Sequence, residues 1–333
     1  MSLDNKIQEL YSLIIEEIKN FIIDDKPSEA IDDNTLSVND YIIIDKRINR
    51  NAIIKTKPID QIYKTEMLET KKTFEDIKKG KNLNISSIEN FVNNALQDMT
   101  GNNNIISRIK QLKEDDDYTY RHSFNVSLLA TNIGKWLGYS NSDLKDLGTA
   151  GLLFDIGKLK IPDHILNRPH QVTAKEIKII QQHTVTGYNM LKSLNLSNNI
   201  LMATLQHHEN IDGSGYPLGL LSNKIHEFAK IIHICDMYDA MTTNKVYADK
   251  KSPFEAADII RTLSGVTLDP TITFIFLSNI SEFYSGSDVL LSDNSVGTII
   301  HINPTNPTKP TIKVNNKFID MTKNSNLKIV DII

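Results

Sequence analysis

The sequence predicts a mainly α-helical protein that ends in a small antiparallel β unit, and three observations support this prediction. From about residue 65 to residue 280, apolar residues recur at intervals of three and four, the period of an amphipathic helix. After residue 285 the pattern changes to short apolar runs separated by turn-forming dipeptides. The first 64 residues combine a helical pattern with a polar stretch and a short apolar run, which indicates a small unit of mixed structure.

These changes in pattern divide the chain into three predicted units. They are an N-terminal unit of unknown role (1–64), a helical domain (65–280) and a small C-terminal β unit (285–333). In the last unit the runs DVLLS, GTIIHI, TIKV and FIDM are the expected strands, and Asp-Asn, Asn-Pro and Asn-Asn pairs mark the expected turns. A chain of 333 residues is long enough to bury a large core and to hold more than one unit.

Composition narrows the classes of partner. The net charge of −4 provides no basic field for a nucleic-acid backbone, so we expect no polymeric nucleic acid as a partner. No apolar run approaches the roughly 20 residues that span a bilayer, and the first residues do not resemble a signal peptide. The single cysteine, Cys235, cannot form an internal disulfide. These features predict a cytoplasmic protein without a membrane partner.

Two histidines lie on predicted buried helix faces. His122 shares its stripe with Val126, Leu129 and Ile133, so it should point into the core. His183 follows a capping box that Thr173 and Glu176 would form. Taken alone, each histidine is more often a core side chain bonded to the backbone than a metal ligand.

Further polar residues occur where an apolar core would not favour them. His207 and His208 are adjacent and precede the turn-rich stretch NIDGSGYPLGL. Asp236 lies in the apolar helical stretch FAKIIHICDMYDAM, where an ionised carboxylate needs a cation or a strong donor. The candidate metal ligands of the helical domain are His122, Asp155, His183, His207, His208 and Asp236. Imidazole and carboxylate ligands without thiolates suit iron, manganese or zinc.

The stretch from about Tyr118 to Tyr247 resembles the HD-GYP domain, a branch of the HD phosphohydrolase superfamily whose characterised members hydrolyse cyclic di-GMP. HHENIDGSGYP, at 207–217, matches the motif HHExxDGxGYP at every fixed position. FDIGK matches HDxGK except that Phe154 replaces the histidine, and CDMYDAMTTNKVY resembles DxYDAxTxxRxY with Lys245 in place of arginine. The final β unit resembles a tail found on some members. The resemblance implies a helical HD-type bundle.

The resemblance also implies two divalent metal ions, iron or manganese, that share Asp155 as a bridging ligand. The first ion would have the ligands His122, Asp155 and Asp236, and the second would have Asp155, His183, His207 and His208. The first ion lacks the histidine that Phe154 replaces, and phenylalanine has no lone pair to donate. Tyr118 stands where members with a third metal have a glutamate, so we expect no third metal.

Substrate contacts follow from the same resemblance. Asp155 and Lys158 would be the catalytic residues, with Lys158 contacting the scissile phosphate. The residues implied in binding cyclic di-GMP are Lys158, Gly215, Tyr216, Pro217, Asp239 and Lys245. The GYP loop, defined here as Gly215–Pro217, could also contact a protein partner.

The sequence leaves several functions open. The first is a metal-dependent phosphodiesterase that hydrolyses cyclic di-GMP to a linear dinucleotide or GMP, with activity reduced by Phe154. The second is a catalytically degenerate protein that acts as a cyclic di-GMP receptor or as a scaffold. A phosphohydrolase for another nucleotide and a helical bundle with incidental histidines are the remaining alternatives.

Overall fold

The computed structural model describes residues 59–81, 83, 85–101, 118–166, 173–243, 250–280, 284–303, 306–324 and 326–333. The chain divides into two compact units, 1–65 and 66–333. The mixed structure predicted for residues 1–64 falls almost entirely outside the described residues. Apart from the start of the first helix, the elements named below belong to the second unit.

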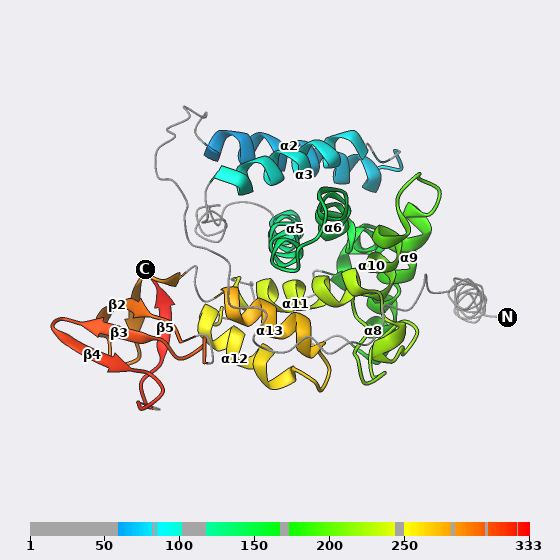
Figure 1. The fold of residues 1–333 in the computed structure, drawn as a ribbon. Helices are drawn as coiled ribbons and strands as arrows, with labels where there is room; N and C mark the ends of the chain where they lie inside the picture. Colours follow the sequence, from blue (N-terminus) through cyan, green and yellow to red (C-terminus); the bar gives the residue numbers. More distant parts are fainter. Residues whose placement is uncertain are drawn as a thin grey trace. The chain divides into compact units, whose positions relative to one another are not determined.

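The second unit is mainly helical, as the sequence predicts (Figure 1). In chain order the helices are α2 (Ile59–Lys78), α3 (Ile85–Gly101), α5 (Tyr118–Trp136), α6 (Asn141–Leu153), α7 (Asp163–Leu166), α8 (Ala174–Gln181), α9 (His183–Leu191), α10 (Asn198–Gln206), α11 (Glu227–Thr242), α12 (Pro253–Leu263) and α13 (Pro270–Ile280). Two short 3₁₀ segments, η2 (Ile156–Lys160) and η3 (Ser222–Lys224), lie between them. None of these described helices is both long and apolar enough to cross a bilayer.

The core lies where α5 packs along α6 and against α11, with α10 covering α6 and α11 (Figure 1). On α5, Val126, Leu129 and Ile133 are buried on the stripe that also carries His122, which confirms the predicted inward direction of that histidine. The rings of Phe91 and Phe124 meet edge to face at 4.3 Å between centroids. Such aromatic contacts add to the stabilisation that burial of the rings provides.

The start of α8 follows the signal in the sequence. Thr173 Oγ1 accepts a hydrogen bond from Glu176 N at 3.3 Å, and Thr173 N donates to Glu176 Oε2 at 2.7 Å, so the predicted capping box is confirmed. The helical pattern that continues through His183 is interrupted at Gln182, where α8 ends and α9 begins. His183 is therefore the first residue of a separate helix.

The C-terminal β unit is a five-stranded antiparallel sheet in the order β4-β3-β2-β1-β5, coloured orange to red in Figure 1. Its strands are β1 (Asp288–Leu291), β2 (Val296–His301), β3 (Thr311–Val314), β4 (Lys317–Asp320) and β5 (Ile329–Ile332). The first four match the predicted runs, whereas β5 was not predicted. Asn294 and Asn315, in the Asp-Asn and Asn-Asn turns, have φ of 65° and 53°, left-handed values that asparagine tolerates.

The sheet contacts α12 through polar side chains. Thr308 Oγ1 donates to Asp258 Oδ1 at 2.6 Å, and Lys309 Nζ lies 3.0 Å from Asp258 Oδ2. Lys250 and Asp331 form a further ion pair at 2.9 Å. The charged groups of these two ion pairs are half-buried or exposed, so each ion pair contributes little to stability.

Candidate metal centre

Asp155 lies in the turn between the end of α6 and the start of η2. Gly157 allows this turn to touch the first turn of α9, because a Cβ atom at 157 would overlap the carbonyl oxygen of His183 and lie 2.6 Å from Gly187 N. Any side chain at this position would push the two segments apart. The glycine therefore brings the Asp155 carboxylate to the His183 ring.

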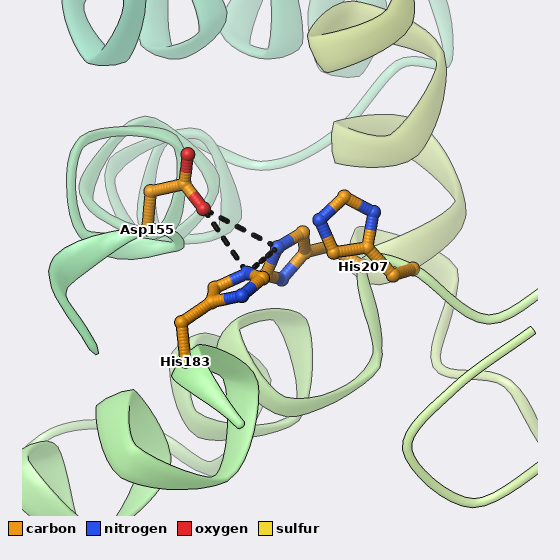
Figure 2. A group of neighbouring side chains, drawn as sticks. Asp155, His183 and His207 are labelled. Carbon is orange, nitrogen blue, oxygen red and sulfur yellow. Dashed lines mark hydrogen bonds and ion pairs between the residues drawn. The ribbon is translucent and has the colours of Figure 1, made fainter. Parts of the chain in front are cut away.

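Asp155, His183 and His207 point toward one another (Figure 2). Asp155 Oδ1 lies 3.2 Å from His183 Nε2 and 3.6 Å from His207 Nε2, and these two nitrogen atoms are 3.1 Å apart. The Nδ1 atoms of the two rings lie 2.6 Å from the Ile180 carbonyl and 2.9 Å from the Thr204 carbonyl. A carbonyl only accepts hydrogen bonds, so each Nδ1 carries a proton, and in this tautomer the lone pair of the ring is on Nε2. Two lone pairs and a carboxylate oxygen thus face each other, which favours a cation among them.

Four of these side chains form a candidate metal-ligand group. Among the described residues, one group has the donor types and spacing for a metal ion, with all ligand atoms within 4.8 Å of one another: Asp155, His183, His207 and His208. Asp155 Oδ1 is buried and accepts no hydrogen bond from any described residue. These observations fit a divalent ion such as iron, manganese or zinc. The structure brings together the four residues that the resemblance assigns to one metal.

The pKa shifts favour the protonation states that bind metal. Burial lowers the pKa of His183, and burial together with the nearby His207 holds the pKa of His208 well below its ordinary value. Burial alone would raise the pKa of Asp155, but attraction to the Lys158 ammonium group outweighs it and holds that pKa well below its usual range. His183 and His208 are therefore neutral and Asp155 is ionised near pH 7.

Lys158 contacts the other oxygen of the same carboxylate. Its Nζ lies 2.5 Å from Asp155 Oδ2, and its side chain is 25% exposed. Burial lowers the pKa of Lys158, but attraction to Asp155 and then to Asp236 outweighs it and leaves the pKa above its ordinary value. The ammonium group is thus charged, close to the ligand set and accessible from solvent.

His122 and Asp236 form a separate pair. His122 Nε2 lies 2.9 Å from Asp236 Oδ1, and His122 Nδ1 lies 2.7 Å from Asp239 Oδ2. Burial acts to lower the pKa of His122, but the hydrogen bonds to the two aspartates raise it to about 10. Because carboxylates only accept, the ring donates from both nitrogen atoms. The two side chains are therefore paired with each other and do not join the four-residue group.

Asp239, predicted to contact substrate, lies beside His122 and Asn125. The residue is 3% exposed, and its carboxylate accepts from His122 at 2.7 Å and from Asn125 Nδ2, also at 2.7 Å. A carboxylate enclosed in this way orients the His122 ring. Lys245, also predicted to bind substrate, lies outside the described residues.

Phe154 lies between the two sets of polar residues. Its ring is fully buried and meets His207 edge-on at 4.9 Å and His122 at 5.7 Å between centroids. The side chain therefore fills space beside both histidines without offering a lone pair.

The GYP loop packs against His208. A Cβ atom at Gly215 would lie 2.5 Å from both Glu209 Cα and the His208 carbonyl oxygen, so only glycine allows this approach. Tyr216 N donates to the same carbonyl at 3.1 Å, and the Tyr216 ring stacks on the His208 ring at 4.8 Å with 28° between their planes. The loop thus places an aromatic ring at the edge of the metal-ligand group.

Two residues that organise this loop were missed in the sequence. Glu209 is buried and accepts from Leu218 N at 2.6 Å and from Leu220 N at 2.8 Å, and its carbonyl lies 3.0 Å from His233 Nδ1 on α11. The signal for Glu209 was its fixed place in the HHExxDGxGYP motif. No sequence signal distinguishes His233 from the apolar residues around it.

The chain resembles known proteins over much of its length. It is 30% identical over 244 residues to the cyclic di-GMP phosphodiesterase PA4108 of Pseudomonas aeruginosa, a match that covers 72% of this chain and 58% of that protein. It is 32% identical over 219 residues to the cyclic di-GMP phosphodiesterase PdeB of Borreliella burgdorferi, covering 64% of this chain and 57% of that protein. The chain therefore spans a little over half the length of these relatives.

A solved structure supports the fold. The HDG"Y"P protein Bd1817 from Bdellovibrio bacteriovorus superposes with a TM-score of 0.54 at 18% identity, covering 68% of this chain and 73% of that chain. The family model described as HD domain matches residues 87–272, which include every residue of the metal-ligand group. Since this match covers more than half of the chain, the protein belongs to the HD-domain family.

Proposed function

We propose that this protein is a metal-dependent phosphodiesterase that hydrolyses cyclic di-GMP to the linear dinucleotide or to GMP, with iron or manganese as the metal. The observation that carries the proposal is the ligand group of Asp155, His183, His207 and His208, buried except for the half-buried His208, beside the Lys158 ammonium. The names of the two relatives, both cyclic di-GMP phosphodiesterases, support the choice of substrate. The complete GYP motif supports the HD-GYP branch of the family.

The residues have distinct roles in this proposal. A divalent ion held by the four ligands would supply Lewis-acid stabilisation of the charge that develops on the phosphodiester. The backbone carbonyls that accept from the Nδ1 atoms of His183 and His207 fix the two rings with Nε2 toward the ion. Lys158 offers its ammonium group to a phosphate oxygen. Tyr216, held on the His208 ring, offers an aromatic face on which a guanine base can stack.

A second function is favoured by one observation, the fully buried Phe154 ring between His122 and His207. If this ring prevents formation of a competent site, the protein would bind cyclic di-GMP without hydrolysing it and would act as a receptor. The same fold and the same ligand group are compatible with that role.

The test is turnover of cyclic di-GMP by full-length protein purified without oxygen and supplied with ferrous or manganous ions. We expect linear product on chromatography, loss of product in His208→Ala and full retention in His164→Ala, which changes an exposed histidine outside the ligand group. Binding of the nucleotide without product would contradict the enzyme proposal and support the receptor. Turnover of a different cyclic dinucleotide in preference would overturn the choice of substrate.

A further inference from the structure

The two carboxylate oxygen atoms of Asp155 face different cations. Oδ1 faces the lone pairs of His183 and His207, where a metal ion fits. Oδ2 lies 2.5 Å from Lys158 Nζ. In a site where one carboxylate bridges two metals, each oxygen atom serves one of them. The oxygen that a second metal would need is therefore in contact with an ammonium group.

The lysine is also attracted to a second carboxylate. The ammonium group lies in the electrostatic field of Asp236 as well as of Asp155. These two aspartates are the carboxylates that the resemblance assigns to the other metal. Lys158 thus places a positive charge beside Asp155, while the protonated His122 ring, 2.9 Å away, places one beside Asp236.

The other side chains that the resemblance assigns to that second ion already have hydrogen-bond partners. His122 faces Asp236 with Nε2 and Asp239 with Nδ1, so both of its nitrogen atoms are already engaged. Phe154 packs edge-on against His122 and supplies no donor atom. Among the described residues, neither His122 nor Asp236 belongs to a group with the spacing of a metal site. The local chemistry favours an internal cation over a second metal.

We propose that the Lys158 ammonium group is the second cation of this centre, so that the protein binds one divalent ion and uses the lysine where a second ion would otherwise contact the Oδ2 atom of Asp155. The inference rests on the metal-dependent site of the proposed function and specifies its composition. A substrate phosphate would then meet one metal and one ammonium group. The lysine is held by the carboxylates before any ligand arrives, and the exposed quarter of its side chain leaves it accessible to a phosphate oxygen.

The test is the number of manganese ions bound by the full-length chain, measured by equilibrium dialysis with elemental analysis and by electron paramagnetic resonance. The wild-type protein should bind one ion and give the spectrum of isolated manganese. Lys158→Met removes the ammonium group, so a second ion should bind at least about tenfold more tightly than to the wild type, because the repulsion between two nearby cations is gone. The second ion should also give the spectrum of a coupled pair.

Lys160→Met is the matched control, because Lys160 is an exposed lysine two residues along the same segment. It should bind manganese as the wild type does. Two ions with a coupled spectrum in the wild type, or equal binding of the second ion by the two variants, would overturn the proposal. The wild-type measurement stands even if Lys158→Met fails to fold. One bound ion without turnover of cyclic di-GMP would contradict the proposed function and leave this inference intact. Two bound ions with turnover would support the proposed function and contradict this inference.

Discussion

The two halves of the polar cluster differ in what their histidines face. In the half formed by His183 and His207, each Nδ1 donates to a backbone carbonyl, so the Nε2 lone pairs converge on one carboxylate oxygen. In the half formed by His122, both nitrogen atoms face aspartates and the ring is a donor on each side. The presence of a histidine in the cluster therefore does not by itself provide a metal ligand. The partner of the other ring nitrogen decides whether a lone pair is available.

The neighbouring residues explain the difference. Gly157 allows α9 to approach Asp155, and this close contact assembles the first half from three separate segments. In the second half, Phe154 fills the space beside His122, and Lys158 binds the Asp155 oxygen that faces away from His183 and His207. The comparison predicts one strong metal site and one internal ion-pair network.

The largest effect should come from Asp155→Asn. This change removes the negative charge that faces both His183 and His207 and also the partner of Lys158. Metal affinity should fall by more than the roughly 10–100-fold that loss of an outer-shell partner causes, because a direct ligand is lost. Calorimetric titration with manganese measures this. Asp163→Asn, which alters an exposed aspartate paired with Lys78, should leave the affinity unchanged, and equal affinities in the two variants would show that Asp155 is not a ligand.

Phe154→His should have the next largest effect. The new imidazole would lie beside His122 and His207 and provide the donor that the second half lacks. Metal content should rise from one ion toward two per chain, and the diesterase rate should rise with it. Phe154→Leu keeps an apolar side chain and should show neither change. Unchanged metal content in the histidine variant would mean that Phe154 is not the reason why the half formed by His122 lacks a metal site.

A smaller effect is expected from Glu209→Gln. The amide has one acceptor oxygen for the two N–H groups of Leu218 and Leu220, so one buried donor is left without its partner, at a cost of about 1–3 kcal/mol. The loop should loosen, and KM for cyclic di-GMP should rise by about tenfold while the metal content stays constant. Glu255→Gln, at an exposed glutamate on α12, serves as the control. Loss of the metal in Glu209→Gln would instead place this residue in the metal centre.

The smallest effect should come from Asp258→Asn. The contacts of Asp258 are with residues outside both halves of the polar cluster. Burial acts to raise the pKa of Asp258, but Thr308 and Lys309 outweigh it and lower the pKa below the ordinary value. A lowered pKa means that this contribution to stability is present above the unfolded-state pKa and is lost as pH falls through the folded-state value.

At pH 7 the variant should therefore lose up to about 1 kcal/mol of unfolding free energy, and below the folded-state pKa it should lose almost none. Denaturant unfolding at the two pH values measures both numbers. Metal content and turnover should match the wild type. A change in either would show that contacts between the sheet and α12 reach the metal centre.

The fold was largely predictable because its signals are local. The stripe of α5, the capping box at Thr173 and the turns at Asn294 and Asn315 are each determined by residues within a few positions of one another, and the structure confirms them. Strand β5 was missed because its run is short and gains its definition from pairing with β1, some 40 residues earlier in the chain. The break at Gln182 was missed because residues on both sides of it favour helix.

The candidate site was predictable in composition but not in pairing. Motif resemblance named the four residues that the structure gathers, and it named His122 and Asp236 with equal weight. Whether a histidine faces a carbonyl or an aspartate depends on contacts between distant helices, such as that of His122 with Asp239. The roles of His233 and Asn125 depend on the same kind of contact and left no pattern in the sequence.

The most direct test of the difference between the two halves is the position of bound manganese in crystals of the full-length protein, located by anomalous scattering. We predict one peak within ligand distance of Asp155, His183, His207 and His208, and no peak between His122 and Asp236. A peak at His122 and Asp236, or no peak at the four-residue group in manganese-saturated crystals, would contradict this account.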